Sequence, residues 1–362
     1  MLYKEEIFDN ITLIQITSRQ INYYRWNLFV VIVVSILLFL NGCKSNNDDF
    51  NGIRITTPYV SIEIDTITLK TNEQCVSGFI YHDMYYIYSL YYGYRLITFD
   101  RLGNIRNSSP LPERIDRHWM LDYSFKNDSL IALNENRGMT TYLLDKELGN
   151  WKLINRMEAP VYEDKDYRVL KTANGEWGGM VYFINKNTQE IYRAYSNEVV
   201  NVVKFHNKYY VTNTSWRSSI YEITYPEKMQ KFHGLINDIV NNRAESNEKE
   251  RYVFEGLKNV VDTSDFSISI AGSFIHKNRF LQLWNVRNEY NSKEVHITEF
   301  INGKLEHRYT FDFDTGIMGI KYLYFDGYKH FLNFDTKYRE IFGAIEIDND
   351  IIKIHFFKQE KE

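Results

Sequence analysis

A strand–turn–strand pattern recurs about six times and constrains the fold more than any other feature of the sequence. Each copy reads as an apolar stretch, a polar turn, a β-rich stretch, a second turn and another strand, as in FIYHDMYYIYSLYYGYRLITFD at residues 79–100. Short strands at regular spacing with turn residues between them are typical of sandwiches, barrels and propellers. A unit of roughly 40–50 residues favours the propeller, whose blades are four-stranded antiparallel sheets.

The composition agrees with this pattern, because 29 Tyr and 23 Phe accompany only 5 Pro. Aromatic and β-branched residues suit a pleated, half-buried surface. We therefore predict an all-β, six-bladed propeller over residues 58–362; a propeller of seven blades is the alternative. The strand at residues 59–69 is expected to close the ring by pairing with the last blade at residues 351–357.

The spacing of the repeats is irregular in two places. The turn residues that mark successive units are separated by 44, 51, 29, 71 and 48 residues; they are Asp83, Asn127, Gly178, Asn207, Asn278 and Asp326. The short interval indicates that this interpretation places the start of the third blade at the wrong residues. The long interval contains a charged segment, residues 226–265, which we interpret as an insertion with a helix.

The amino-terminal segment points to export. Residues 28–40 read LFVVIVVSILLFL, with Arg19 and Arg25 before them and Leu-Asn-Gly-Cys43 at their end. A membrane-spanning helix needs roughly 20 apolar residues, and a run of 10–14 is more typical of a signal peptide. We predict a signal segment over residues 1–42 and a flexible connection over residues 43–57. An uncleaved signal anchor and a buried apolar helix are the alternatives.

Several of these features together resemble a known group. Leu-Asn-Gly-Cys43 resembles the bacterial lipobox, and the polar KSNNDD after it is similar to the export tag of surface lipoproteins. With about six strand–turn units, the chain resembles the six-bladed TolB-like or NHL-like propeller lipoproteins of Bacteroidetes-type bacteria. The resemblance implies a lipid on Cys43 and an outer-membrane location, on the periplasmic or the surface side. It implies no catalytic residue.

Charge and cysteine content limit the partners. The net charge of −4 and the lack of any Lys/Arg run argue against a nucleic-acid partner, which needs a concentrated basic patch. The membrane, reached through the lipid, is an expected partner. If Cys43 carries the lipid, Cys75 is the one remaining cysteine and forms no disulfide.

Two sets of residues are candidates for contacts on the rim of the propeller. His82, His206 and His276 fall at the same predicted turn of three blades, where they would either bind an acidic ligand or a metal, or simply face the solvent. Trp119, Trp216 and Trp284 recur roughly once per blade. Aromatic side chains stack on sugar rings and anchor interfaces, and they equally fill the space between blades.

The sequence favours binding over catalysis. Asp314-Thr315-Gly316 occurs once, whereas aspartic-protease chemistry needs two such carboxylates. No metal motif, cofactor motif or phosphate loop is present, and we expect no cofactor and assign no catalytic residue. The first hypothesis is a non-enzymatic propeller that presents one face to a protein or glycan. The alternatives are a glycan-active hydrolase or lyase with carboxylates in the central funnel, and a structural partner in an envelope complex.

Overall fold

The computed structural model describes residues 52–360 with gaps. The gaps are 82, 90–94, 112–120, 127–128, 135–139, 146–149, 155–159, 173–178, 197, 215–217, 241–252, 264–267, 288–292, 312–318, 327–328, 336–340 and 349. The chain divides into two compact units, Met1–Asp49 and Phe50–Glu362. The first unit, with Cys43 and the predicted signal segment, lies outside the described residues.

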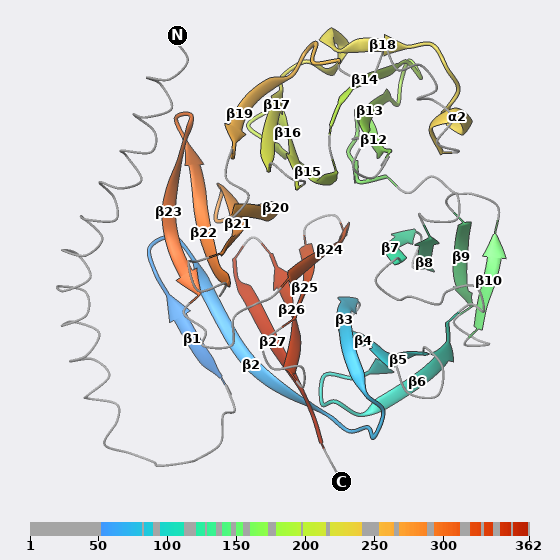
Figure 1. The fold of residues 1–362 in the computed structure, drawn as a ribbon, viewed down its shortest axis with the longest axis vertical. Helices are drawn as coiled ribbons and strands as arrows, with labels where there is room; N and C mark the ends of the chain where they lie inside the picture. The colour runs from blue at the N-terminus through green and yellow to red at the C-terminus, as the bar shows by residue number, and fades with distance from the viewer. Residues whose placement is uncertain are drawn as a thin grey trace, which may run out of the picture. The chain divides into compact units, whose positions relative to one another are not determined.

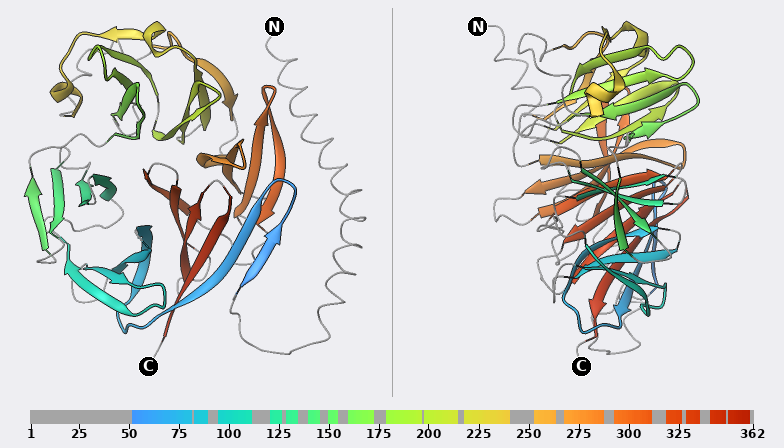
Figure 2. Two further views of the ribbon diagram at one scale, coloured as in Figure 1. Left: turned by 180° about the vertical axis from the view of Figure 1, so that it is seen from behind. Right: turned by 90° about the vertical axis from the view of Figure 1, so that its right-hand side faces the viewer.

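The second unit contains six β-sheets that follow one another around a ring (Figures 1 and 2). Each sheet contains four antiparallel strands that form one blade, which makes the fold a six-bladed, all-β propeller, as the repeated pattern predicts. The strands, blade by blade, are β3 (Cys75–Tyr81), β4 (Met84–Ser89), β5 (Arg95–Phe99) and β6 (Ile105–Pro110); β7 (Leu121–Lys126), β8 (Ser129–Asn134), β9 (Thr140–Asp145) and β10 (Asn150–Ile154); β11 (Tyr162–Glu163), β12 (Tyr167–Lys171), β13 (Met180–Asn185) and β14 (Ile191–Tyr195); β15 (Val199–Phe205), β16 (Lys208–Asn213), β17 (Ser219–Ile223) and β19 (Lys258–Asp262); β20 (Ile268–His276), β21 (Arg279–Arg287), β22 (Lys293–Ile301) and β23 (Lys304–Phe311); and β24 (Gly319–Asp326), β25 (Lys329–Asp335), β26 (Ile341–Ile347) and β27 (Ile352–Gln359).

The third blade begins earlier than the sequence pattern suggested. Its first hairpin turn lies between β11 and β12, and Gly178 falls instead in the connection between β12 and β13, outside the described residues. The side chain of Asp164 forms this turn by accepting the backbone N–H groups of Asp166 and Tyr167 at 2.8 and 2.7 Å. An Asp that caps its own turn is a common turn signal. The short interval between units therefore arose because the sequence interpretation took a later turn of the third blade for its first one.

The long interval contains a segment that joins two blades. After β17 the chain forms the 3-10 helix η4 (Pro226–Lys228), strand β18 (Gln230–Phe232) and helix α2 (Ile236–Val240), and it then returns to the fourth blade as β19. Strand β18 pairs antiparallel with β14, so it becomes a fifth, outermost strand of the third blade. Within its described residues the segment thus contributes strand as well as helix, and α2 is only five residues long.

The ring closes through the amino-terminal strands, as predicted. Strand β2 (Ser61–Leu69) pairs in parallel with β27, from Ile62 opposite Ile352 to Leu69 opposite Gln359. Strand β1 (Ile53–Thr56) pairs antiparallel with β2 and extends this sheet to six strands. The last blade therefore contains strands from both ends of the second unit.

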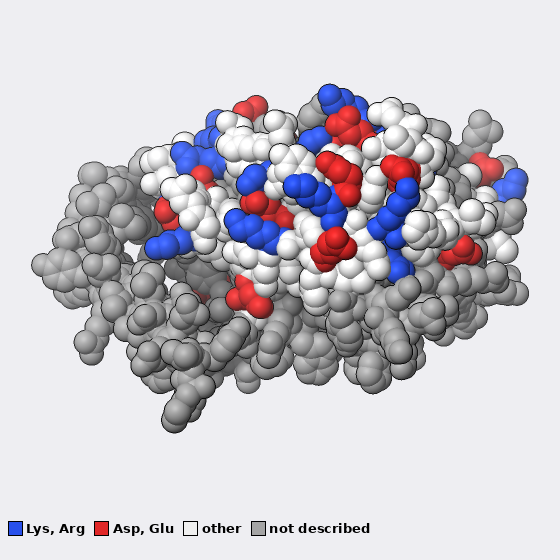
Figure 3. Space-filling model, turned by 90° about the horizontal axis from the view of Figure 1, so that it is seen from above, with Lys and Arg blue, Asp and Glu red and all other residues white. Residues whose placement is uncertain are grey.

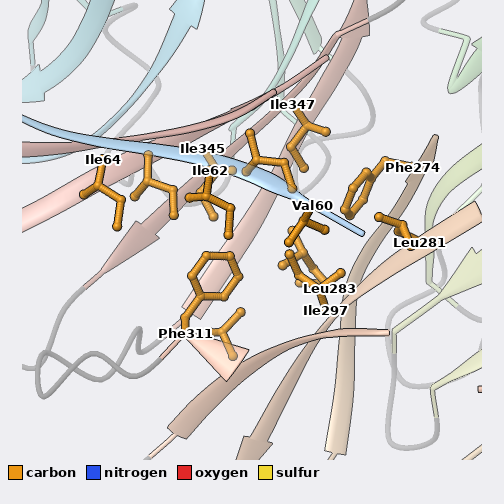
Figure 4. Packing of buried hydrophobic residues seen from close by; sticks show 14 of the residues in the cluster. Val60, Ile62, Ile64, Phe274, Leu281, Leu283, Ile297, Phe311, Ile345 and Ile347 are labelled. Atoms are coloured by element: carbon orange, nitrogen blue, oxygen red, sulfur yellow. The ribbon is translucent and has the colours of Figure 1, made fainter. Parts of the chain in front are cut away.

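Strand β2 fills the seam between the fifth and sixth blades, where "seam" means the packed interface of two neighbouring blades. Ile62 and Ile64, together with Val60 just before the strand, are almost fully buried (Figure 4). They pack against Phe274, Leu281, Leu283, Ile297 and Phe311 of the fifth blade and Ile345, Ile347, Ile352, Ile354 and Phe356 of the sixth. Burying each such side chain contributes about 1.5–3 kcal/mol. The alternation of β2, SIEIDTITL, matches a strand with one buried face.

The carboxyl end of β2 reaches the first blade. The N–H of Lys70 donates to the carbonyl oxygen of Gly103, in the turn between β5 and β6, at 3.0 Å. Gly103 has a φ of +76°, and a Cβ atom there would lie 2.0 Å from the carbonyl oxygen of Thr68. Only glycine permits this close approach of two backbones. Strand β2 thus contacts the fifth, sixth and first blades.

Candidate functional site

Four residues singled out in the sequence lie outside the described residues. They are Cys43, His82, Trp119 and Trp216. The lipidation site and half of the predicted rim contacts therefore stay predictions.

His276 lies inside the protein and not in a turn. It is the last residue of β20, and the turn is formed by Lys277 and Asn278, both with positive φ. Its imidazole is fully buried and lies between the N–H of Ser61, 3.4 Å from Nε2, and the carbonyl oxygen of Asp348, 3.1 Å from Nδ1. This arrangement requires a neutral ring with its proton on Nδ1, and burial lowers the pKa of His276 accordingly. His276 fixes the start of β2 against the fifth blade.

His206 occupies the turn that the sequence predicted. Its φ is +46°, it is exposed, and its ring stacks on Phe205 with centroids 3.9 Å apart. Trp284, in contrast, is buried in the seam between the fourth and fifth blades, and its Nε1 donates to Thr298 Oγ1 at 2.7 Å. Of the predicted rim residues that the structure describes, His206 is exposed to solvent, whereas His276 and Trp284 belong to the packing.

A buried glutamate recurs at one strand position in three successive blades. Glu222, Glu299 and Glu346 each lie on the third strand of a blade, opposite the residue two positions after the start of the second strand. All three are at least nine-tenths buried. The second strands of the same blades start with Lys208, Arg279 and Lys329. The sequence carries this signal as IYEI, ITEF and AIEI, which strand counting alone did not reveal.

In the fourth blade the glutamate binds cross-strand partners near the seam with the fifth. Lys208 Nζ lies 2.8 Å from Glu222 Oε1, and the hydroxyl of Tyr210 donates to Glu222 Oε2 at 3.2 Å. The ring of Tyr210 contacts Phe280 of the fifth blade, with centroids 4.5 Å apart. Burial, followed by the charge of Glu222, raises the pKa of Tyr210 to about 12.

In the fifth blade two arginines share one glutamate. Arg279 Nη1 lies 3.0 and 2.9 Å from the two oxygens of Glu299, and Arg308 Nε lies 2.6 Å from Oε2. Both guanidinium groups lie over the ring of Tyr59, with Cζ 5.2 and 4.3 Å from its centroid. A cation over an aromatic face adds about 0.5–1 kcal/mol at exposed sites and more when desolvated. Tyr59, just before β2, is thereby bound to the fifth blade.

In the sixth blade the glutamate belongs to a cluster at the seam with the first blade, which we call the closure cluster: Asp65, Asp83, Tyr85, Arg101, Glu346 and His355. Nδ1 of His355 lies 3.3 Å from Asp65 Oδ2, and its Nε2 lies 3.7 Å from Glu346 Oε2. Arg101 of the first blade lies 3.5 Å from the same Glu346 oxygen and 2.9 Å from Asp83.

The charge state of His355 follows from its surroundings. Burial alone would lower its pKa, but the carboxylates of Asp65 and Glu346 outweigh burial and raise the pKa above the usual 6.5. Tyr85 Oη accepts from Arg101 at 3.3 Å, and its ring lies 5.7 Å from the His355 ring. The closure cluster thus places an imidazole of raised pKa and a guanidinium around one buried carboxylate, and it joins β2, β26, β27 and the first blade.

A fourth polar cluster joins the third and fourth blades. Lys204 Nζ lies 2.7 Å from Asp164 Oδ2, and the Tyr209 hydroxyl donates to the same oxygen at 2.9 Å. Burial would raise the pKa of Asp164, but Lys204 and the backbone N–H donors hold it below the usual value. Burial and then Asp164 raise the pKa of Tyr209. The charged groups of this cluster stabilise the seam.

The described residues have three further general properties. No group of three or more His, Cys, Asp or Glu side chains among them is placed to hold a metal ion. The face seen from the side of β18 and β19 carries Lys and Arg interspersed with Asp and Glu (Figure 3). Among the described residues, Lys231 pairs with Glu190 at 2.5 Å and Lys186 with Glu163 at 2.9 Å. In the part of the chain that the structure describes, we find no helix with the length and hydropathy of a membrane span.

Comparisons with known proteins give only distant similarities. No family model matches the sequence, and no curated protein matches it significantly. Among solved structures, the chain is similar to the periplasmic gluconolactonase PpgL of Pseudomonas aeruginosa, at 15% identity over 76% of this chain and 79% of that one, with a TM-score of 0.38. The β-propeller domain of Myceliophteria thermophila Cps50 (Swd1) matches at 10% identity, 79% and 91% coverage and a TM-score of 0.37. A thermostable family-43 glycoside hydrolase matches at 12% identity, 79% and 94% coverage and a TM-score of 0.33.

These likenesses are too distant to carry an activity to this chain. The assignment as a six-bladed propeller rests on its own sheets and seams.

Proposed function

We propose that this chain is a lipid-anchored propeller of the bacterial envelope that binds a protein or glycan and catalyses no reaction. The observation that carries the proposal is the repeated seam glutamate. Glu222, Glu299 and Glu346 recur at one position of three successive blades, and each has a cationic neighbour. Glu222 and Glu299 pair with cations of their own blades, and Glu346 pairs with Arg101 of the next blade, so these contacts fix the blades internally and hold the closure of the ring. A preorganised scaffold presents its loops to a partner at a lower ordering cost.

The same observation weighs against the glycan-active alternative. A glycosidase needs two carboxylates about 5–10 Å apart that reach the substrate. The carboxylates of Glu222, Glu299 and Glu346 are instead buried beside Lys or Arg side chains at the seams. Their burial and pairing give them a structural role, which supports binding as the primary function.

The lipid anchor rests on the sequence before β1. The lipobox-like Leu-Asn-Gly-Cys43 follows the apolar run, and β1 begins at Ile53, ten residues after the cysteine. Labelled palmitate fed to cells that produce the full-length chain tests this anchor. We expect incorporation into the wild-type protein and none into Cys43→Ser. Incorporation into Cys43→Ser would contradict the anchor.

Binding is tested by capture in the envelope. Cells that express the full-length, tagged chain are treated with a membrane-permeant crosslinker, and the solubilised envelope is purified on the tag. We expect one protein or glycan species to be recovered in a constant ratio to the chain. Glycan strands that are shortened by the purified protein, with no species retained, would support the enzymatic alternative and contradict the proposal.

A further inference from the structure

Two histidines on the outer strands of the fifth blade direct ring nitrogens at a single hydroxyl group. His296 lies on β22, and His307 and Thr310 lie on the adjacent β23. Nδ1 of His296 lies 3.0 Å from Thr310 Oγ1, and Nε2 of His307 lies 2.8 Å from the same oxygen. The two rings meet edge to face, with centroids 5.6 Å apart. Neither histidine belongs to the seam clusters described above.

The neighbours of His296 determine which of its nitrogens carries the proton. Glu294 Oε2 lies 3.3 Å from Nε2 of His296. A carboxylate beside one ring nitrogen keeps the proton there, so the lone pair of Nδ1 points toward Thr310. The same carboxylate–imidazole pairing orients metal-binding histidines in general.

His307 faces the same hydroxyl from the other side. A neutral imidazole carries its proton on one ring nitrogen and can present the lone pair of the other to Thr310. The Thr310 hydroxyl has one proton and can satisfy one of the two lone pairs.

We propose that His296 and His307 form a two-histidine binding site for a divalent transition-metal ion, with solvent completing the coordination. Imidazole binds Cu²⁺ more tightly than Ni²⁺ or Zn²⁺ at a site of given geometry, so Cu²⁺ is the ion expected to bind best. A metal–nitrogen distance of about 2.0–2.1 Å requires each ring to move by somewhat less than 1 Å as the ion takes the place of the hydroxyl. His296 is partly and His307 more fully exposed, which permits this movement.

The site is independent of the proposed binding function. Two protein ligands hold an ion less tightly than three or four, so the ion is expected to exchange readily with solvent. Glu294 does not touch the ion in this arrangement; it positions His296 through Nε2.

Copper titration of the purified full-length protein tests the proposal. Isothermal calorimetry gives the affinity, and electron paramagnetic resonance of the bound Cu²⁺ reports its nitrogen ligands. We expect one ion per chain with two imidazole nitrogens. His296→Gln and His307→Gln should each weaken binding at least about tenfold, because loss of even an outer partner costs that much. His206→Gln, which removes an exposed histidine of the fourth blade, should leave binding unchanged.

Two further variants distinguish a site in which both histidines bind the same ion from ordinary surface histidines that bind copper singly. Thr310→Val removes the competing hydroxyl and should tighten copper binding, whereas a purely structural hydrogen-bond ladder predicts no gain. Glu294→Gln should weaken binding about tenfold. Copper binding that is equally strong in wild type, His296→Gln and His307→Gln would overturn the proposal, as would a wild-type spectrum with one nitrogen ligand.

Discussion

The carboxylate of Asp65 and the imidazole of His355 face each other across the parallel strands β2 and β27, with Oδ2 3.3 Å from Nδ1. This contact joins the first long strand of the propeller to its last. His355 also faces Glu346 of β26, and through that carboxylate the cluster reaches Arg101 of the first blade. The ring therefore closes at a charged cluster.

Stability should fall with rising pH because of His355. Its pKa is raised in the folded protein, so its contribution is fully present below the unfolded value near 6.5 and is lost as the pH rises through the folded value. The groups facing it are Asp65, Glu346, Arg101 and the ring of Tyr85. Urea unfolding between about pH 6 and 9 measures this slope.

The variant His355→Gln should lose that part of the slope, and His206→Gln, which changes an exposed histidine, should keep it. Parallel profiles for wild type and His355→Gln would show that the imidazole does not carry the dependence.

The seam glutamate of the fifth blade should matter far more than a surface glutamate beside it. Glu299→Gln leaves Arg279 and Arg308 without their shared carboxylate and should cost about 3 kcal/mol, the scale for breaking a buried ion pair. Glu306, whose side chain is 50% exposed, also pairs with Arg308. Glu306→Gln should change the free energy of unfolding by less than about 0.5 kcal/mol. Equal losses in the two variants would contradict the seam role.

Substitutions at two glycines allow the cost of backbone strain to be measured apart from the cost of a steric clash. Gly303 has a φ of +81°, and a Cβ atom there would meet nothing within 4 Å, whereas at Gly103, with φ +76°, it would lie 2.0 Å from the backbone of Thr68. Gly303→Ala should cost about 1 kcal/mol from strain alone. Gly103→Ala should cost on the order of 3 kcal/mol, because β2 must also move away from the first blade. Thermal or urea unfolding measures both, and similar costs would argue against the close contact.

Counting thiols tests the lipid on Cys43. Cys75 is buried, and burial followed by the charge of Glu73 raises its pKa to about 12, so it should not react with a thiol reagent in the folded protein. In denaturant, protein purified from the envelope should show one reactive thiol per chain, since a lipid thioether blocks Cys43. Cys75→Ser should then show none. Two thiols in the wild type would mean that Cys43 is unmodified.

The blade architecture and the closure of the ring could both be predicted from the sequence. Strands with one buried face alternate visibly, as in SIEIDTITL, and their turns carry Asp, Asn and Gly. The third blade was misplaced because its first strand is two residues long and leaves almost no apolar pattern. The outer strand β18 could not be foreseen, because only its pairing with β14 shows that it returns to an earlier blade.

The candidate site was harder to predict than the fold. His276 was placed one residue too late, and that shift moves the side chain from an exposed turn to a buried strand position. The seam glutamates are visible as IYEI, ITEF and AIEI only once the strand register is known. The closure cluster combines residues nearly three hundred positions apart, such as Asp65 and His355, which no local pattern connects.

The central structural claim, that β2 closes the ring in parallel register with β27, can be measured with a pair of cysteines. Glu63 lies opposite Lys353, at a strand spacing of about 4.8 Å. In a Cys75→Ser background, the pair Glu63→Cys and Lys353→Cys should be joined by a short thiol crosslinker in the folded protein. The pair Glu63→Cys and Lys358→Cys, in which the register sets the second residue roughly 16 Å further along the strand, should not be joined. Crosslinking of the second pair in place of the first would contradict this closure of the propeller.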